Sequence, residues 1–147
     1  MRIVKVLCLA VVVMMATGCS CRTRNVGPGN IPVPGDGGPL RDISFAYDSY
    51  ALDSSGRAVA AANADWLKEN PNATVEIEGH CDERGTNEYN MVLGSNRAKA
   101  VMDYLTTQGI SSSRLTTISY GEELPLDPGH NPSAWARNRR VHHKVSE

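Results

Sequence analysis

Hydrophobic side chains recur at every second position in two stretches of the chain, and a period of two predicts β-strands with one buried face. The first stretch covers residues 43–47 and the second covers residues 73–79. Glu76 and Glu78 share one face of the second strand. We expect that face to remain solvated, as a sheet covered on one side only allows.

Apolar residues at helical spacing predict a helix after each of these strands. Asp53 or Ser54 can cap the first helix, which is expected to stop before Pro71. The second helix is predicted over residues 87–108, with a glycine directly after it. Each helix is therefore long enough to connect two strands that run in the same direction.

The remaining residues predict a strand over 115–120, a loop over 121–132, a short helix over 133–138 and a last strand over 139–145. The resulting order is β-α-β-α-β-(α)-β. It predicts an α+β fold, a two-layer sandwich in which a mixed sheet has the helices on one face. The two crossover helices predict parallel neighbouring strands with right-handed connections.

The first 18 residues have the form of a secretory signal. Arg2 and Lys5 precede an uninterrupted apolar run over residues 6–15, and small residues follow it. An apolar run of about ten residues is too short to span a membrane, which needs roughly 20. We therefore expect residues 1–18 to be removed from the mature protein.

The segment that ends this signal is ATGC, from Ala16 to Cys19, and it resembles a bacterial lipobox with Ala16 where Leu is most common. The resemblance implies that Cys19 is acylated and becomes the new N-terminus. Several acyl chains make membrane attachment effectively permanent. Ser20 in the next position favours delivery to the outer membrane. Plain secretion with an unmodified Cys19 is the alternative.

Glycine and proline dominate the next segment, with nine of these residues among the 19 from Arg22 to Leu40. Such a segment forms neither a helix nor a central strand. We interpret residues 19–40 as a lipidated N-terminus followed by an extended tether, and residues 41–147 as the folded domain.

Charge and cysteine content exclude two classes of protein. Removal of the signal takes away Arg2 and Lys5, which leaves 13 basic against 16 acidic residues, a net charge of −3. This balance argues against nucleic-acid binding. Processing leaves three cysteines, Cys19, Cys21 and Cys81, which is too few for a disulfide framework, although a Cys21–Cys81 bridge stays open.

Candidate chemistry concentrates in one stretch, EGHCDERGTNEYN, which covers residues 78–90. It lies between a predicted strand and a predicted helix. Thr86 or Asn87 can cap that helix, and Glu88 suits its positive end. Backbone N–H groups at the helix start form a ready anion site.

Arg97 interrupts the apolar stripe of the following helix, which contains Leu93, Val101 and Leu105 at helical spacing. A guanidinium on an inward face needs a carboxylate or a route to water. Asp82, in the loop before the helix, is a natural partner. The two can face a shared cleft that binds a zwitterionic ligand, with Asp82 on the ammonium and Arg97 on the carboxylate. An internal Asp82–Arg97 ion pair without a ligand is the alternative.

A catalytic Cys/His pair and a metal site fit this stretch less well. His80 and Cys81 are neighbours on an extended chain, so their side chains point in opposite directions. His80, Cys81 and Asp82 lack a second pair of metal ligands at a recognised spacing, and His142 and His143 fall on two strand faces. We expect no metal and no cofactor, and interpret Cys81 as a small filler side chain.

The same stretch, with LGSNRAKAVMDYL after it, ISFAYDSYAL before it and SYGEELP and NRR further on, resembles the OmpA-like C-terminal domain family, and within it the peptidoglycan-associated lipoproteins. The resemblance implies non-covalent binding of the meso-diaminopimelate in the peptidoglycan stem peptide, without catalysis. It implies Asp82 and Arg97 as principal ligands, Asn90 as a hydrogen-bonding residue, and Asp48 and Arg139 as further residues of the cleft.

The resemblance also implies TolB and other components of the Tol–Pal system as partners, and a role in outer-membrane constriction during cell division. The chain departs from the family at Cys81, where Ala or Thr is usual, and at Ala46, where Asp is common and contacts with TolB are in doubt. Two other functions remain as alternatives: a cysteine peptidase that acts on peptidoglycan, and a module that binds proteins only.

Overall fold

The computed structural model describes residues 38–146, and everything below concerns those residues. The expected signal, the acylated Cys19 and nearly all of the tether lie outside them. Along the described part of the chain, no helix is both long and apolar enough to cross a membrane.

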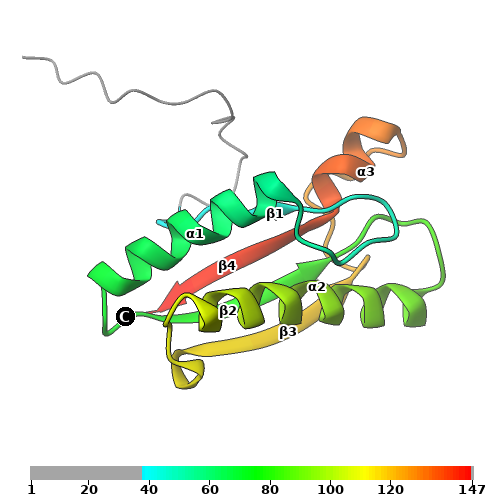
Figure 1. The fold of residues 1–147 in the computed structure, drawn as a ribbon. Coiled ribbons are helices and arrows are strands. Elements are labelled where there is room, and N and C mark those ends of the chain that lie inside the picture. Colours follow the sequence, from blue (N-terminus) through cyan, green and yellow to red (C-terminus); the bar gives the residue numbers. More distant parts are fainter. Residues whose placement is uncertain (1–37, 147) are drawn as a thin grey trace, which may run out of the picture. The chain divides into compact units, whose positions relative to one another are not determined.

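Four strands, three α-helices and one short 3-10 helix make up the described fold (Figure 1). Their order along the chain is the predicted one, and most bounds agree within one or two residues. They are β1 (Ile43–Ser44), α1 (Ser54–Glu69), β2 (Thr74–His80), α2 (Asn87–Thr107), η1 (Ser112–Arg114), β3 (Leu115–Gly121), α3 (Pro132–Asn138) and β4 (Arg140–Ser146).

The sheet is mixed, and its strand order is β1-β4-β2-β3. Strands β2 and β3 are parallel neighbours, as the crossover helix α2 predicts. Strand β4 pairs antiparallel with both β1 and β2. The expectation that β1 and β2 are neighbours is therefore wrong: they run in the same direction, but the last strand lies between them.

Strand β1 is shorter than its alternating pattern predicts, because it ends at Ser44 rather than at residue 47. The carbonyl oxygens that follow it accept hydrogen bonds from arginine side chains instead of a neighbouring strand. Arg139 donates to Phe45 and Arg97 donates to Ala46. Asp48 then takes the left-handed conformation with φ of 50°, and this turns the chain away from the sheet.

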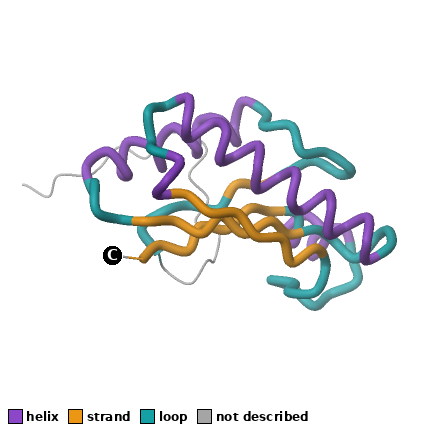
Figure 2. Tube along the Cα trace, turned by 90° about the horizontal axis from the view of Figure 1, so that it is seen from below, coloured by secondary structure: helices purple, strands orange, loops and turns teal. Residues whose placement is uncertain are grey.

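Two layers form the fold, as expected, with α1 and α2 on one face of the sheet (Figure 2). Helix α3 lies at one end of the sheet (Figure 1). The core between the layers is aliphatic and is supplied by every long element; its largest fully buried aliphatic side chains are Ile43, Leu67, Val75, Ile77, Val101, Leu105 and Val141.

Three helices begin at side-chain caps, and the two caps predicted for the long helices are confirmed. The Asp53 carboxylate accepts from the backbone N–H of Gly56, and the Thr86 hydroxyl accepts from Tyr89. Asn131 caps α3 in the same way. Each cap satisfies one donor of the first helical turn and stabilises the helix by about 1 kcal/mol.

Helix α2 approaches β2 more closely than side chains would allow, because a glycine stands on each element at the contact. A Cβ atom on Gly79 would overlap with the backbone carbonyl of Gly94. The close contact brings the first half of α2 against the end of β2, where the stretch of residues 78–90 begins.

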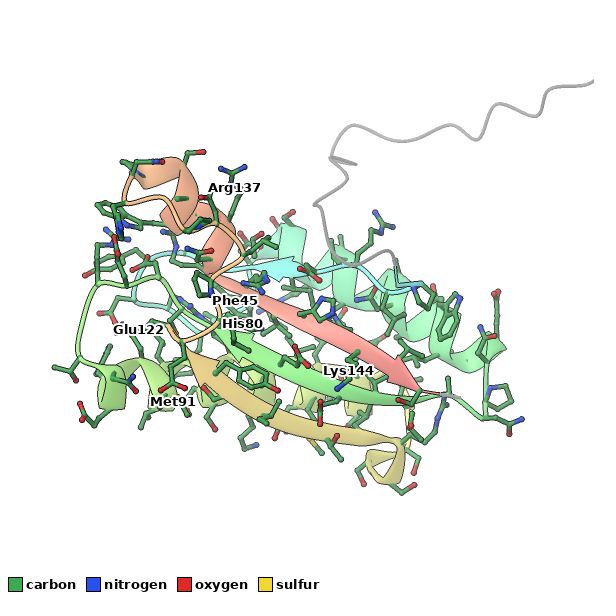
Figure 3. All side chains as sticks on the ribbon, turned by 180° about the vertical axis from the view of Figure 1, so that it is seen from behind. Phe45, His80, Met91, Glu122, Arg137 and Lys144 are labelled. Atoms are coloured by element: carbon green, nitrogen blue, oxygen red, sulfur yellow. The ribbon has the colours of Figure 1, made fainter. Side chains whose placement is uncertain are left out.

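The other face of the sheet is only partly solvated. Glu76 is exposed and pairs with Lys144 of β4, which lies on the open face in Figure 3. The expectation of a solvated face holds there, but Glu78 is largely covered. Nearby, the ring of His80 is buried and stacks on Tyr120.

Replacing Gly79 by alanine tests the contact between β2 and α2. We expect the free energy of unfolding to fall by about 3 kcal/mol, because the two backbones must separate to admit the methyl group. Urea denaturation followed by circular dichroism measures it. Gly38→Ala is the matched control, since nothing lies within 4 Å of a Cβ atom there. Equal stability of the two variants would contradict the close approach.

Acid should destabilise the fold through two buried histidines. Burial lowers the pKa of His143, in the core, and of His80 from 6.5 to about 4. The unfolded chain therefore takes up these protons at a higher pH than the folded one. The contribution of the two neutral histidines to the free energy of unfolding is complete above pH 6.5. It is lost as the pH falls towards 4, by on the order of 3 kcal/mol for each histidine.

Urea denaturation at a series of pH values between 7.5 and 4 measures this loss. His143→Leu should flatten the decline, because one of the two buried histidines is gone. The control is His130→Gln, at an exposed position. A decline as steep in His143→Leu as in wild type would contradict the assignment.

Candidate functional site

A cavity of about 140 Å³ opens where β2 ends and α2 begins. All five residues expected at a binding site line it: Asp48, Asp82, Asn90, Arg97 and Arg139. They come from four separate segments of the chain. Its other lining residues are Tyr47, Cys81, Arg84, Gly85, Tyr89 and Leu93.

Arg97 is the most deeply placed charge, with 1% of the residue exposed. Its guanidinium donates to three backbone carbonyl oxygens, at 2.8 Å to Ser49, 2.8 Å to His80 and 3.1 Å to Ala46. It also lies 3.4 Å from the sulfur of Cys81. Burial lowers the pKa of Arg97, but the carbonyl dipoles compensate the charge. Arg97 thus ties α2 to the end of β2 and to the loop after β1.

Asp82 is 3% exposed and pairs with arginines other than the one expected. Arg84 and Arg139 form ion pairs with it, at 2.7 Å and 3.1 Å. The alternative of an internal Asp82–Arg97 ion pair is therefore wrong for the described residues. Burial acts to raise the pKa of Asp82, but the hydrogen bonds from Arg84 and Arg139 outweigh it and lower the pKa below its usual value.

Two aromatic rings hold the Arg84 guanidinium beside Asp82. Its central carbon lies 3.9 Å from the centre of the Tyr47 ring and 4.4 Å from that of Trp135. The indole N–H of Trp135 donates to Glu83 at 2.7 Å, and this hydrogen bond lowers the pKa of Glu83. The loop after β2 and helix α3 are joined in this way at the mouth of the cavity.

Asn90 and Cys81 fasten the loop to the first turns of α2. The Asn90 amide donates to the carbonyl of Asp82 at 3.1 Å and to the carboxylate of Glu122 at 2.5 Å. The thiol of Cys81 donates to the carbonyl of Asn90 at 3.3 Å. Both residues are buried, so the position of Asp82 relative to α2 is determined by tertiary contacts.

Asp48 lies in the loop after β1, not at the end of a longer strand as expected, and its carboxylate is exposed. The hydroxyl of Tyr89 on α2 donates to it. The two carboxylates of the cavity thus differ: Asp82 is buried and enclosed by arginines, whereas Asp48 is exposed to solvent.

Cys81 has no histidine among its hydrogen-bond partners in the described structure. Burial raises the pKa of its thiol, which favours the unreactive protonated form. It is a free thiol there. The bridge to Cys21 that the sequence left open involves a residue outside the described ones. Among residues 38–146, no group of three or more His, Cys, Asp or Glu side chains could hold a metal ion.

Sequence reasoning located the cavity through Asp82 and Arg97 but missed Arg84, Tyr47 and Trp135. Arg84 is only two residues from Asp82, so an ion pair between them was readable from the motif. The aromatic partners are 37 and 51 residues away from Arg84 along the chain and carry no signal that connects them to it.

Comparison with known proteins agrees with this architecture. A model of the OmpA family matches residues 44–139. The peptidoglycan-associated lipoprotein of Pseudomonas putida is 41% identical over 152 aligned positions, which cover 90% of this chain and 91% of that protein. The protein of the same name from Agrobacterium fabrum is 44% identical over 99 residues, 67% of this chain. The match spans little more than half of that relative, 56% of its length.

Two solved structures resemble the chain in three dimensions. The peptidoglycan-associated lipoprotein from Burkholderia pseudomallei has a TM-score of 0.70 at 37% identity, over 72% of this chain and 90% of that one. The C-terminal domain of Helicobacter pylori MotB has a TM-score of 0.69 at 22% identity, over 74% and 85%. The second resemblance concerns the fold alone.

Proposed function

The chain belongs to the OmpA family, and from that premise we propose that it binds peptidoglycan non-covalently and without catalysis, as a lipoprotein that attaches the outer membrane to the cell wall. Relatives that align with most of the chain are named peptidoglycan-associated lipoproteins. The chemistry of the cavity supports the same function independently of these names.

The observation that carries the proposal is the presence of both charge signs in one small cavity. Asp48 and Asp82 supply carboxylates, and Arg97 and Arg139 supply guanidinium groups. A ligand with a single charge could pair with only one of these two sets. A zwitterionic centre, such as the free end of meso-diaminopimelate in a stem peptide, pairs with both sets.

The two arginines are unequally available to a ligand carboxylate. Arg97 uses four of its five N–H groups within the fold, three on carbonyls and one on Cys81. Arg139 uses two, on Phe45 and Asp82. We therefore assign the ligand carboxylate to the remaining N–H groups of Arg139 together with the charge and last N–H of Arg97.

The carboxylates receive the ammonium group, with Asp82 in the depth of the cavity and Asp48 at its rim. Asn90 is given a supporting part: it holds the loop in place and lies beside the path of the stem peptide. All five residues expected from the sequence keep a role. Arg139, however, offers more free N–H groups to the ligand carboxylate than Arg97 does.

Membrane attachment belongs to the same proposal. Residues 1–18 would be a lipoprotein signal, Cys19 the acylated N-terminus, residues 19–40 the tether and residues 41–147 the wall-binding domain facing the periplasm. TolB and the other Tol–Pal components are the proposed protein partners, in envelope integrity and cell division. The names of relatives and the lipobox support the lipid anchor, whereas the Tol–Pal partners rest on the family resemblance.

The two alternatives receive different support. A cysteine peptidase is disfavoured by the raised pKa and burial of Cys81. A module that binds proteins only draws support from four exposed apolar or aromatic side chains on α2 and on the loop after β1: Tyr47, Tyr50, Tyr89 and Val92. Such a surface is also compatible with a TolB-like partner beside the cavity.

Pull-down with purified sacculi tests the site. Wild type should be retained, whereas Asp82→Ala and Arg97→Ala should lose roughly ten- to hundredfold in affinity, the scale of one charge-assisted contact. Asp103→Ala and Lys99→Ala are the matched controls, because that ion pair lies on the exposed side of α2. Thermal denaturation verifies that each variant is folded. Unchanged retention of both site variants would refute the proposed site.

Fractionation of cells tests the membrane attachment. Cys19→Ser removes the acylated atom, so the variant should leave the outer-membrane fraction, because only the acyl chains hold the mature protein there. Cys21→Ser, two residues on, is the control and should stay with the membrane. A Cys19→Ser protein that remains in the outer-membrane fraction after sacculi are digested would contradict lipid anchoring.

A further inference from the structure

The Asp82 carboxylate has no acceptor site left for a ligand. Its Oδ1 accepts from the backbone N–H and the Nε–H of Arg84, both at 3.1 Å. Its Oδ2 accepts from Nη2 of Arg84 at 2.7 Å and from Nη1 of Arg139 at 3.1 Å. An ionised carboxylate offers about four lone-pair sites. An ammonium can therefore bind Asp82 only where one of these donors leaves.

The donor that leaves could belong to Arg84 or to Arg139. The two guanidinium groups differ in how they are bound to the rest of the fold. Arg139 is 16% exposed at its side chain, and its Nε–H also donates to the carbonyl of Phe45. The side chain of Arg84 is 34% exposed, and it donates its hydrogen bonds to Asp82. Arg84 also stands on the short loop before α2, whereas Arg139 is tied to the segment after β1.

The contacts on the other side of Arg84 are to two aromatic rings, which a ligand cation can also contact. The rings of Tyr47 and Trp135 face its guanidinium at 3.9 Å and 4.4 Å. Cation–π contacts at exposed positions are modest, and an ammonium from a ligand can take the same place against the Tyr47 ring. Exchange of one cation for another also keeps Asp82 paired, so its buried charge is never left without a partner.

We propose that Arg84 occupies the ammonium subsite in the ligand-free protein and that an ammonium-bearing ligand displaces its guanidinium from Asp82. The proposal rests on the proposed function, since it concerns the same cavity. Arg84 becomes a residue that determines specificity: it keeps Asp82 closed to water and to solutes without an ammonium group. The displaced side chain moves outward, where it is already partly exposed.

Isothermal titration calorimetry with two synthetic tripeptides tests the displacement. One is L-alanyl-γ-D-glutamyl-meso-diaminopimelate, and the other has L-2-aminopimelate in the last position, which keeps the second carboxylate but lacks the second ammonium. Arg84→Met keeps the length of the side chain and removes its charge. It should bind the first peptide roughly tenfold more tightly than wild type, because no internal cation competes for Asp82. It should bind the second no more tightly.

Lys99→Met is the matched control, since it removes one positive charge from the exposed side of α2, and it should bind like wild type. Equal or weaker binding of the diaminopimelate peptide to Arg84→Met would overturn the displacement while leaving the proposed function intact. Failure of wild type itself to bind that peptide would overturn the proposed function, and the displacement with it.

A second measurement needs no variant. In the wild-type protein, the nuclear magnetic resonance signal of the Arg84 Nε–H reports its hydrogen bond to Asp82. Saturating diaminopimelate peptide should shift this signal and speed its exchange with water, and the aminopimelate peptide should leave it in place. A signal unchanged by bound diaminopimelate peptide would overturn the displacement.

Discussion

The fold around the cavity depends on one buried charge. Arg97 lies within the apolar stripe of α2, and no carboxylate forms an ion pair with it among the described residues. Its guanidinium is instead surrounded by the carbonyls of Ala46, Ser49 and His80. A buried cation must be compensated, so these three carbonyls are held in one arrangement. The loop after β1 and the end of β2 are thereby fixed to a single helix.

The glycine contact makes this arrangement possible. Because Gly79 and Gly94 carry no Cβ atoms, α2 lies close enough to β2 for Arg97 to reach the His80 carbonyl, one residue before Cys81. The same approach brings Asn90 against the backbone of Asp82. The side chains of Arg97 and Asn90 therefore position the cavity by hydrogen bonds to backbone carbonyls.

The cavity contains charges of both signs, and its two carboxylates have different kinds of partner. Asp82 is enclosed by Arg84 and Arg139, whereas Asp48 is exposed and accepts from Tyr89. A zwitterionic ligand can enter such a site by exchanging partners, and no charge has to be buried alone. The MotB domain has the same fold at 22% identity. Fold likeness alone therefore says little about this chemistry, which depends on the particular side chains at the end of β2.

The sequence by itself determined the local features: the alternating strand β2, the caps Asp53 and Thr86, and the inward position of Arg97 on α2. These follow from backbone periodicity and from hydrogen bonds between residues close in the chain. It also identified five residues that line one cavity. Only the tertiary structure decided that β4 lies between β1 and β2, that β1 stops at Ser44, and that Arg139, and not Arg97, joins Arg84 on Asp82. Each of these features depends on which residues contact one another, and most of the contacting residues are 40 or more positions apart in the chain. Tertiary packing decides such contacts, and the local periodicity of the sequence does not predict them.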